Sequence, residues 1–128
     1  PWLMLRTFLL ATVAAGSLLG ANAAVHTHLV KAEPGIDSTV TVAPKQVRLW
    51  FNEAPEVALS AATIVKADNS PVATIKLAAT DDPLSVAGTI PVPIEPGTYN
   101  ILWRTGSKDG HAVRGKYSFK FDPAAAKP

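Results

Sequence analysis

The residues best suited to chemistry are a carboxylate and an imidazole two positions apart, Asp109 and His111, within Ser107-Lys108-Asp109-Gly110-His111. In extended backbone, residues i and i+2 point to the same side, about 6.5–7 Å apart at Cα, so both side chains can reach one small cation. Gly110 between them carries no side chain and lets the backbone bend. This spacing indicates a candidate metal site.

The chain has three histidines, and the other two, His26 and His28, lie where we expect a secreted chain to begin. If His26 is the first mature residue, its α-amine and its ring can chelate one metal together. An α-amine has a pKa of about 7.7–8.0, so a metal displaces its proton near neutral pH. Amine, imidazole and carboxylate ligands suit Cu(II). Our hypothesis is that His26, Asp109 and His111 bind Cu(II), with His28 a spare ligand or an exposed residue.

The same residues also have an interpretation without metal. Asp109-Gly110 is a common hairpin turn, and His111 is then a surface residue beside it. His26 and His28 are in that case an accidental pair near the chain end. The spacing alone does not separate the two interpretations.

Composition excludes several kinds of site. The chain has no cysteine, which rules out thiolate centres such as blue copper, cysteine-bound zinc and iron–sulfur clusters. Its one methionine, Met4, lies in the N-terminal apolar stretch. Removing residues 1–25 takes only Arg6 from the 12 basic residues, which leaves 11 against 10 acidic ones and a net charge of +1. We therefore expect no nucleic-acid partner.

The N-terminal stretch is typical of a secretory signal peptide. An apolar run at 8–20 follows Arg6 and precedes Ala21-Asn22-Ala23, an A-x-A cleavage signal. The alternative is an uncleaved membrane anchor, but the run is short for a span of about 20 residues. We predict a signal peptide at residues 1–25.

The rest of the chain predicts one β domain at residues 26–122, followed by a C-terminal tail at 123–128. About seven short strands alternate with Pro- and Gly-rich turns, and no helix is convincing. This favours an all-β fold, a seven-stranded antiparallel Greek-key sandwich or barrel of immunoglobulin- or cupredoxin-like type. We expect the first strand at 26–32, a strand rather than a helix at 58–65, a strand at 84–92 that Pro91 and Pro93 confine to an edge or end, and a central strand at 98–104. The expected core aromatics are Trp50, Phe51, Trp103 and Phe119.

The order of these features resembles the CopC family of periplasmic copper-binding proteins. The resemblance spans about 26–121 and rests on His26-Thr27-His28-Leu29, Pro34, the segment 43–53, Pro96-Gly97-Thr98-Tyr99, Trp103, Asp109-Gly110-His111, Gly115 and Tyr117-Ser118-Phe119. It implies a seven-stranded β-barrel or sandwich with Cu(II) held by the amine and ring of His26, by Asp109 and by His111. It also implies a monomeric, non-enzymatic periplasmic carrier for copper resistance or uptake, beside an inner-membrane copper transport protein. Some members carry a Met-rich loop for Cu(I), which this sequence lacks, so a Cu(II)-only member is expected.

The sequence departs from the family pattern at the expected mature N-terminus. Cleavage after Val25 fits the preference for a small residue poorly, and Ala21-Asn22-Ala23 favours cutting before Ala24. The terminus Ala24-Val25-His26 could itself wrap Cu(II) with amine, two backbone amides and imidazole. Asp109 and His111 would then have a different role.

Two other functions compete with a copper carrier. An N-terminal histidine that chelates copper on a β-sandwich also resembles oxidative polysaccharide-cleaving copper enzymes, although Asp109 would occupy a position that oxygen activation needs open. The second alternative is a metal-free binding module of immunoglobulin-like type. Copper uptake separates the metal-free module from the two copper-binding functions. Peroxide-dependent sugar cleavage separates the enzyme from the carrier.

Overall fold

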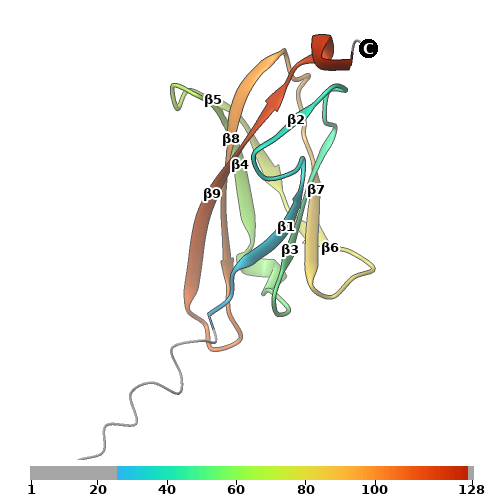
Figure 1. Cartoon of the computed structure of the whole chain (residues 1–128). Coiled ribbons are helices and arrows are strands. Elements are labelled where there is room, and N and C mark those ends of the chain that lie inside the picture. The colour runs from blue at the N-terminus through green and yellow to red at the C-terminus, as the bar shows by residue number, and fades with distance from the viewer. Residues whose placement is uncertain (1–25, 127–128) are drawn as a thin grey trace, which may run out of the picture.

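The computed structural model describes residues 26–126, so the predicted signal peptide lies outside the described residues. Two β-sheets pack face to face, one with strand order β1-β3-β7-β6 and the other with β2-β9-β8-β4-β5 (Figure 1). The strands are β1 (Leu29–Glu33), β2 (Ser38–Val40), β3 (Gln46–Phe51), β4 (Ala61–Lys66), β5 (Pro71–Lys76), β6 (Ala78–Ala79), β7 (Ser85–Thr89), β8 (Gly97–Gly106) and β9 (Ala112–Phe121). The prediction of an all-β sandwich is confirmed.

Alternation along the strands explains how the two sheets close on one core. In β3, Val47, Leu49 and Phe51 are buried while the residues between them are not. In β8, Tyr99, Ile101 and Trp103 face inward in the same way. The rings of Phe51 and Trp103 meet across the sheets edge to face, 5.3 Å between centroids. Burial of these side chains is what stabilises the fold.

The prediction that Trp50 belongs to the core is wrong. It sits on the outward side of β3, between the inward Leu49 and Phe51, and is only partly buried. Lys31 Nζ lies 4.4 Å and Arg48 Cζ 4.5 Å from the Trp50 ring centroid, so the indole is covered by two cations instead of by the core.

Several element boundaries also differ from the expectation. The first strand begins at Leu29 rather than residue 26, and the residues before it are hydrogen-bonded to Asn52 and Glu53. Val57–Leu59 is a 3₁₀ helix, η1, that packs on Gly106, where a Cβ would lie 2.5 Å from Leu59 Cδ1. The strand expected at 84–92 stops at Thr89, before the prolines, and lies inside its sheet between β3 and β6.

Two more differences concern the far end of the sandwich. β2 pairs with β9 in parallel, because the chain crosses from β1 in one sheet to the edge of the other and back to β3. Pro123–Ala126 forms a second 3₁₀ helix, η2, where we expected a frayed tail. Asp122 Oδ1 accepts a hydrogen bond from the Ala124 backbone N–H at 3.0 Å, which starts that turn.

β8 lies in the middle of its sheet, as expected, and forms a long hairpin with β9. The hairpin loop and the beginning of β1 lie at the same end of the sandwich, while η2 lies at the other end (Figure 1). Among residues 26–126, no helix is long and apolar enough to cross a membrane.

Candidate metal centre

The loop between β8 and β9 is closed by its own backbone. The Ser107 N–H donates to the His111 carbonyl at 2.9 Å, and the Gly110 N–H donates to the Ser107 carbonyl at 2.9 Å. Gly110 has φ of 86°, a conformation that glycine adopts without strain. The turn expected from Asp-Gly is therefore present, and it presents both candidate ligands from one loop.

Asp109 is the centre of the hydrogen bonding within this loop. Its Oδ1 accepts from the Ser107 hydroxyl and from the His111 backbone N–H at 3.1 Å. Its Oδ2 lies 2.7 Å from His111 Nδ1. The Ser107 hydroxyl, followed by the ring and the backbone N–H of His111, lowers the pKa of Asp109 well below its usual range. The carboxylate is therefore ionised and can serve a cation.

The Asp109 contact also fixes how the His111 ring is presented. A carboxylate only accepts hydrogen bonds, so the ring directs an N–H at Nδ1 to Asp109 and leaves Nε2 outside this contact. The side chains of His111 and Asp109 are 83% and 64% exposed, so no packing blocks access to them. A histidine oriented by a carboxylate in this way is a common arrangement in metal sites.

The segment before β1 is held by residues that follow β3. The His28 N–H donates to Asn52 Oδ1 at 2.7 Å, and Asn52 Nδ2 donates to the His26 carbonyl at 3.1 Å. The Asn52 N–H donates to the His28 carbonyl at 3.2 Å. The buried Thr27 hydroxyl donates to a Glu53 carboxylate oxygen. These contacts carry the start of the described chain to the end of the sandwich where the loop lies.

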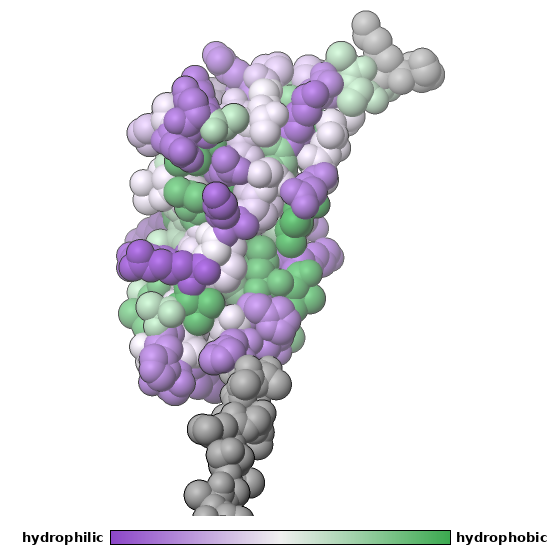
Figure 2. All heavy atoms as spheres, turned by 60° about the vertical axis from the view of Figure 1, so that its left-hand side comes forward, coloured by the Kyte–Doolittle hydropathy of each residue, from purple (hydrophilic) through white to green (hydrophobic). Residues whose placement is uncertain are grey.

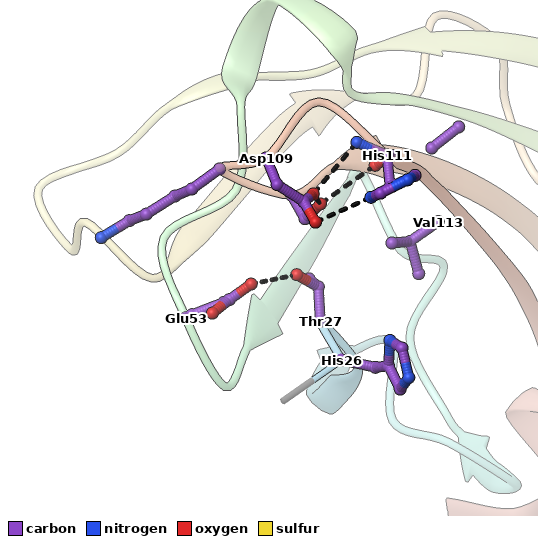
Figure 3. A pocket seen from close by; sticks show the side chains of 9 residues that line it. His26, Thr27, Glu53, Asp109, His111 and Val113 are labelled. Carbon is purple, nitrogen blue, oxygen red and sulfur yellow. Dashed lines mark hydrogen bonds and ion pairs between the residues drawn. The ribbon is translucent and has the colours of Figure 1, made fainter. Parts of the chain in front are cut away.

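One pocket of about 490 Å³, here called the end pocket, joins the two segments. Figure 3 shows Asp109 and His111 on one side and His26 on the other, with Val113 beside them and Thr27 bonded to Glu53. The full lining is His26, Thr27, Glu53, Ser107, Lys108, Asp109, His111, Ala112 and Val113. The structure therefore brings His26, Asp109 and His111, from the two ends of the domain sequence, to the same place.

These three side chains are not yet a closed ligand set. Among residues 26–126, no three His, Cys, Asp or Glu side chains lie close enough together to hold one metal ion. Asp109 and His111 are paired, whereas the exposed His26 ring stands apart from them (Figure 3). His28 does not line the end pocket, and its Nδ1 lies 3.1 Å from the His26 carbonyl oxygen.

The sequence alone assigned no role in the site to Thr27, Asn52 or Glu53. A signal was available, because a strand was expected at 26–32 and the alternation of polar and apolar residues at 46–51 predicts another. If they pair antiparallel, as they do, the residues after the second strand lie beside those before the first. The pairing of strands was the missing information.

The CopC domain family matches residues 29–122 of this chain. The chain is 33% identical over 125 residues to copper resistance protein C of Pseudomonas syringae pv. tomato, covering 92% of this chain and 98% of that protein. It is 31% identical over 104 residues to protein YobA of Escherichia coli K12, covering 80% and 84% respectively.

Solved structures show the same likeness. The crystal structure of CopC from Methylosinus trichosporium OB3b superposes with a TM-score of 0.69 at 33% identity, covering 76% of this chain and 94% of that one. PcoC, a methionine-rich copper resistance protein from Escherichia coli, superposes with a TM-score of 0.65 at 32% identity, covering 77% and 100%.

Proposed function

This chain belongs to the CopC family of copper-binding, copper-resistance proteins, and we propose that it carries Cu(II) in the end pocket on His26, Asp109 and His111. The observation that supports this most is that His26 lines the same pocket as the Asp109–His111 pair at one end of the sandwich. Neither segment alone supplies enough ligands, and the pocket that both segments line supports a shared site.

The donor set favours Cu(II) over Cu(I). The pocket offers imidazole nitrogens and a carboxylate, which suit Cu(II), while sulfur ligands select Cu(I). The chain has no cysteine and its only methionine is Met4. We therefore propose a Cu(II) site without a second, sulfur-based Cu(I) site.

Closure of the site requires two movements, because the His26 ring must turn toward the loop and the Asp109 carboxylate must leave His111 Nδ1 to reach a metal on Nε2. The Asp109 contact engages His111 Nδ1 and leaves Nε2 as the ring nitrogen available to a metal. The His26 ring is exposed, so it can turn toward the loop without displacing core side chains. Asn52 holds the His26 carbonyl, which keeps the backbone near the pocket while the ring turns.

The proposal includes maturation of the chain. We propose that residues 1–25 are a signal peptide, that residues 26–122 form the copper-binding domain in the periplasm, and that 123–128 are a tail. Cleavage before His26 frees an α-amine next to the ring, and the two groups chelate one metal together. The protein then acts as a monomeric, non-catalytic carrier or buffer that passes copper to an inner-membrane transport protein.

Intact mass of the secreted protein, with and without Cu(II), tests the proposal directly. It reports the first residue and the copper stoichiometry together, and an electron paramagnetic resonance signal identifies the bound ion as Cu(II). One copper per chain is expected, with binding lost in His26→Ala and in His111→Ala. His28→Ala is the matched control, since His28 is exposed and outside the end pocket, and it should bind as the wild type does.

Two results would reject the proposed site. Wild-type affinity in both His26→Ala and His111→Ala would show that copper binds elsewhere. Equal loss in His28→Ala would show that the N-terminal segment binds copper without the loop.

A further inference from the structure

The outward side of the five-stranded sheet carries a group of cations, here called the basic face: Lys76, Arg104, Arg114 and Lys116. Three of them lie in one row across the sheet, because Lys76 and Arg104 both pair with Ala61, and Arg104 pairs with Arg114. Lys116 lies in the next row, opposite Leu102. All four are exposed, so their charges face solvent together.

No carboxylate on these strands balances the basic face. Strands β4, β5, β8 and β9 contain no Asp or Glu. The side-chain ion pairs found among residues 26–126 use other cations, namely Arg48 with Asp81, Lys120 with Asp122, and His111 with Asp109. Carboxylates near these strands lie in the connecting segments, at Glu56, Asp68, Glu95, Asp109 and Asp122.

This arrangement is a segregation of charge and not an excess of it. Arg6 and Lys127 lie outside the described residues, so ten basic side chains remain in residues 26–126 against ten acidic ones. A described region of zero net formal charge thus places four cations on one sheet face and its acids elsewhere. Such a face attracts an acidic partner through complementary potential.

The pairing of Arg104 with Arg114 is a second observation. Like charges directly opposite one another on neighbouring strands destabilise a sheet. An anion bound between the two guanidinium groups would offset that repulsion, and arginine binds carboxylates through two parallel hydrogen bonds. The pair is therefore suited to a carboxylate that comes from outside the chain.

A hollow of about 300 Å³ lies next to this pair. Trp103 and Gly115 form part of its lining, and Leu102 at its side is 39% exposed. A Cβ on Gly115 would lie 2.4 Å from Trp103 Cζ2, so only glycine lets the indole lie across β9 at this point. In Figure 2 the side of the molecule that carries β5, β8 and β9 is turned forward, and hydrophobic patches alternate there with hydrophilic side chains.

We infer that the basic face binds an acidic segment of a partner protein, with carboxylates on Arg104 and Arg114 and an apolar side chain in the hollow. The concave, partly apolar hollow favours a peptide over an anionic membrane, because a bilayer surface has no side chain to insert. The hollow and the end pocket share no lining residue, so binding here does not require copper. Both sites lie on the β8–β9 hairpin, which would place such a partner beside the end pocket.

Fluorescence polarisation tests this with the full secreted chain and a short fluorescein-labelled peptide of glutamate and aspartate with one central phenylalanine. The double variant Arg104→Glu/Arg114→Glu should bind the probe at least about tenfold more weakly. The matched control is Lys31→Glu/Lys45→Glu, which makes the same change of net charge on the other side of the molecule and should bind as the wild type does. If the glutamate pair prevents folding, Arg104→Gln/Arg114→Gln removes the charges without reversing them.

Further probes identify the occupant. Replacing the central phenylalanine of the peptide by alanine should weaken binding, because the hollow is then empty. Equal loss of binding in the two double variants would overturn the inference, since net charge alone would explain it. Binding to phosphatidylglycerol vesicles but not to the peptide would also overturn it, in favour of a membrane surface. Cu(II) titration of the same variants is expected to be unchanged, which separates this inference from the copper proposal.

Discussion

The loop Ser107–His111 and the segment His26–His28 face the same end pocket but are held in different ways. The loop is fixed by hydrogen bonds among its own residues, with Asp109 as the common acceptor. The segment is fixed by Asn52 and Glu53, which lie 24 to 26 residues away in sequence. One side of the site is thus organised locally, and the other depends on the pairing of β1 with β3.

This difference has a consequence for copper binding. The locally organised loop already holds the His111 ring through Asp109, so little order is lost at His111 on binding. The His26 ring stands apart and must turn to complete the set (Figure 3). We therefore expect changes in the loop to act on affinity most, and changes around Asn52 to act on both stability and affinity.

Among variants that keep all three histidines, the largest effect is expected from Asp109→Ala. The change removes the acceptor of three hydrogen bonds and a proposed ligand, so Cu(II) affinity should fall about 10–100-fold. Competition titration against a copper chelator measures it. Asp109→Asn keeps one acceptor oxygen and should lie between Asp109→Ala and the wild type. Unchanged affinity in Asp109→Ala would mean that the loop is organised by its backbone alone.

Asn52→Ala tests the other side of the pocket. Its side chain holds the His28 N–H and the His26 carbonyl, so the free energy of unfolding should fall by about 1–2 kcal/mol. Cu(II) affinity should fall less than in Asp109→Ala, because the ligands themselves remain. Thermal melts with and without Cu(II) measure both effects. Gln46→Ala, at the exposed start of β3, is the control, and an equal loss of stability there would contradict a specific role for Asn52, which follows that strand.

Gly110→Ala separates backbone conformation from side-chain contacts in the loop. No atom lies within 4 Å of where the Cβ would be, so the only cost is the φ of 86°. A loss of about 1–2 kcal/mol in the free energy of unfolding is expected from that conformation, with a smaller loss of Cu(II) affinity. Denaturant unfolding followed by tryptophan fluorescence measures the first quantity. A stabilised variant would contradict the observed turn.

The smallest effect is expected from Thr27→Val, which removes the hydroxyl that donates to Glu53. The free energy of unfolding should fall by about 0.5–1.5 kcal/mol, because Glu53 is only partly buried and can turn to water. Thr27→Ser keeps the hydroxyl and should stay near the wild type. A larger loss in the serine variant than in the valine variant would show that packing of the methyl group, and not the hydrogen bond, holds this segment.

Prediction from sequence succeeded where the signal is local. The alternation of polar and apolar residues in Gln46–Phe51 predicts a strand, and β3 has the same bounds. The Asp-Gly turn also lies where expected. Prediction failed where residues from other strands determine the position or pairing of an element. Trp50 is a residue type that is common in protein cores, but it lies on the outward side of its sheet. There Lys31 and Arg48 cover it. The parallel pairing of β2 with β9 could not be predicted from the alternation of polar and apolar residues.

The sequence by itself determined the chemical types at the site, because ligand preference depends on side-chain atoms: three histidines, one closely spaced aspartate and no cysteine. It also determined the strand-rich fold class, through alternation and turn residues. Only the tertiary structure decided that His26 reaches the pocket of Asp109 and His111, and that Arg104 stands opposite Arg114. The physical reason is that strand pairing and register depend on the whole sheet, and they bring together residues that no local pattern relates.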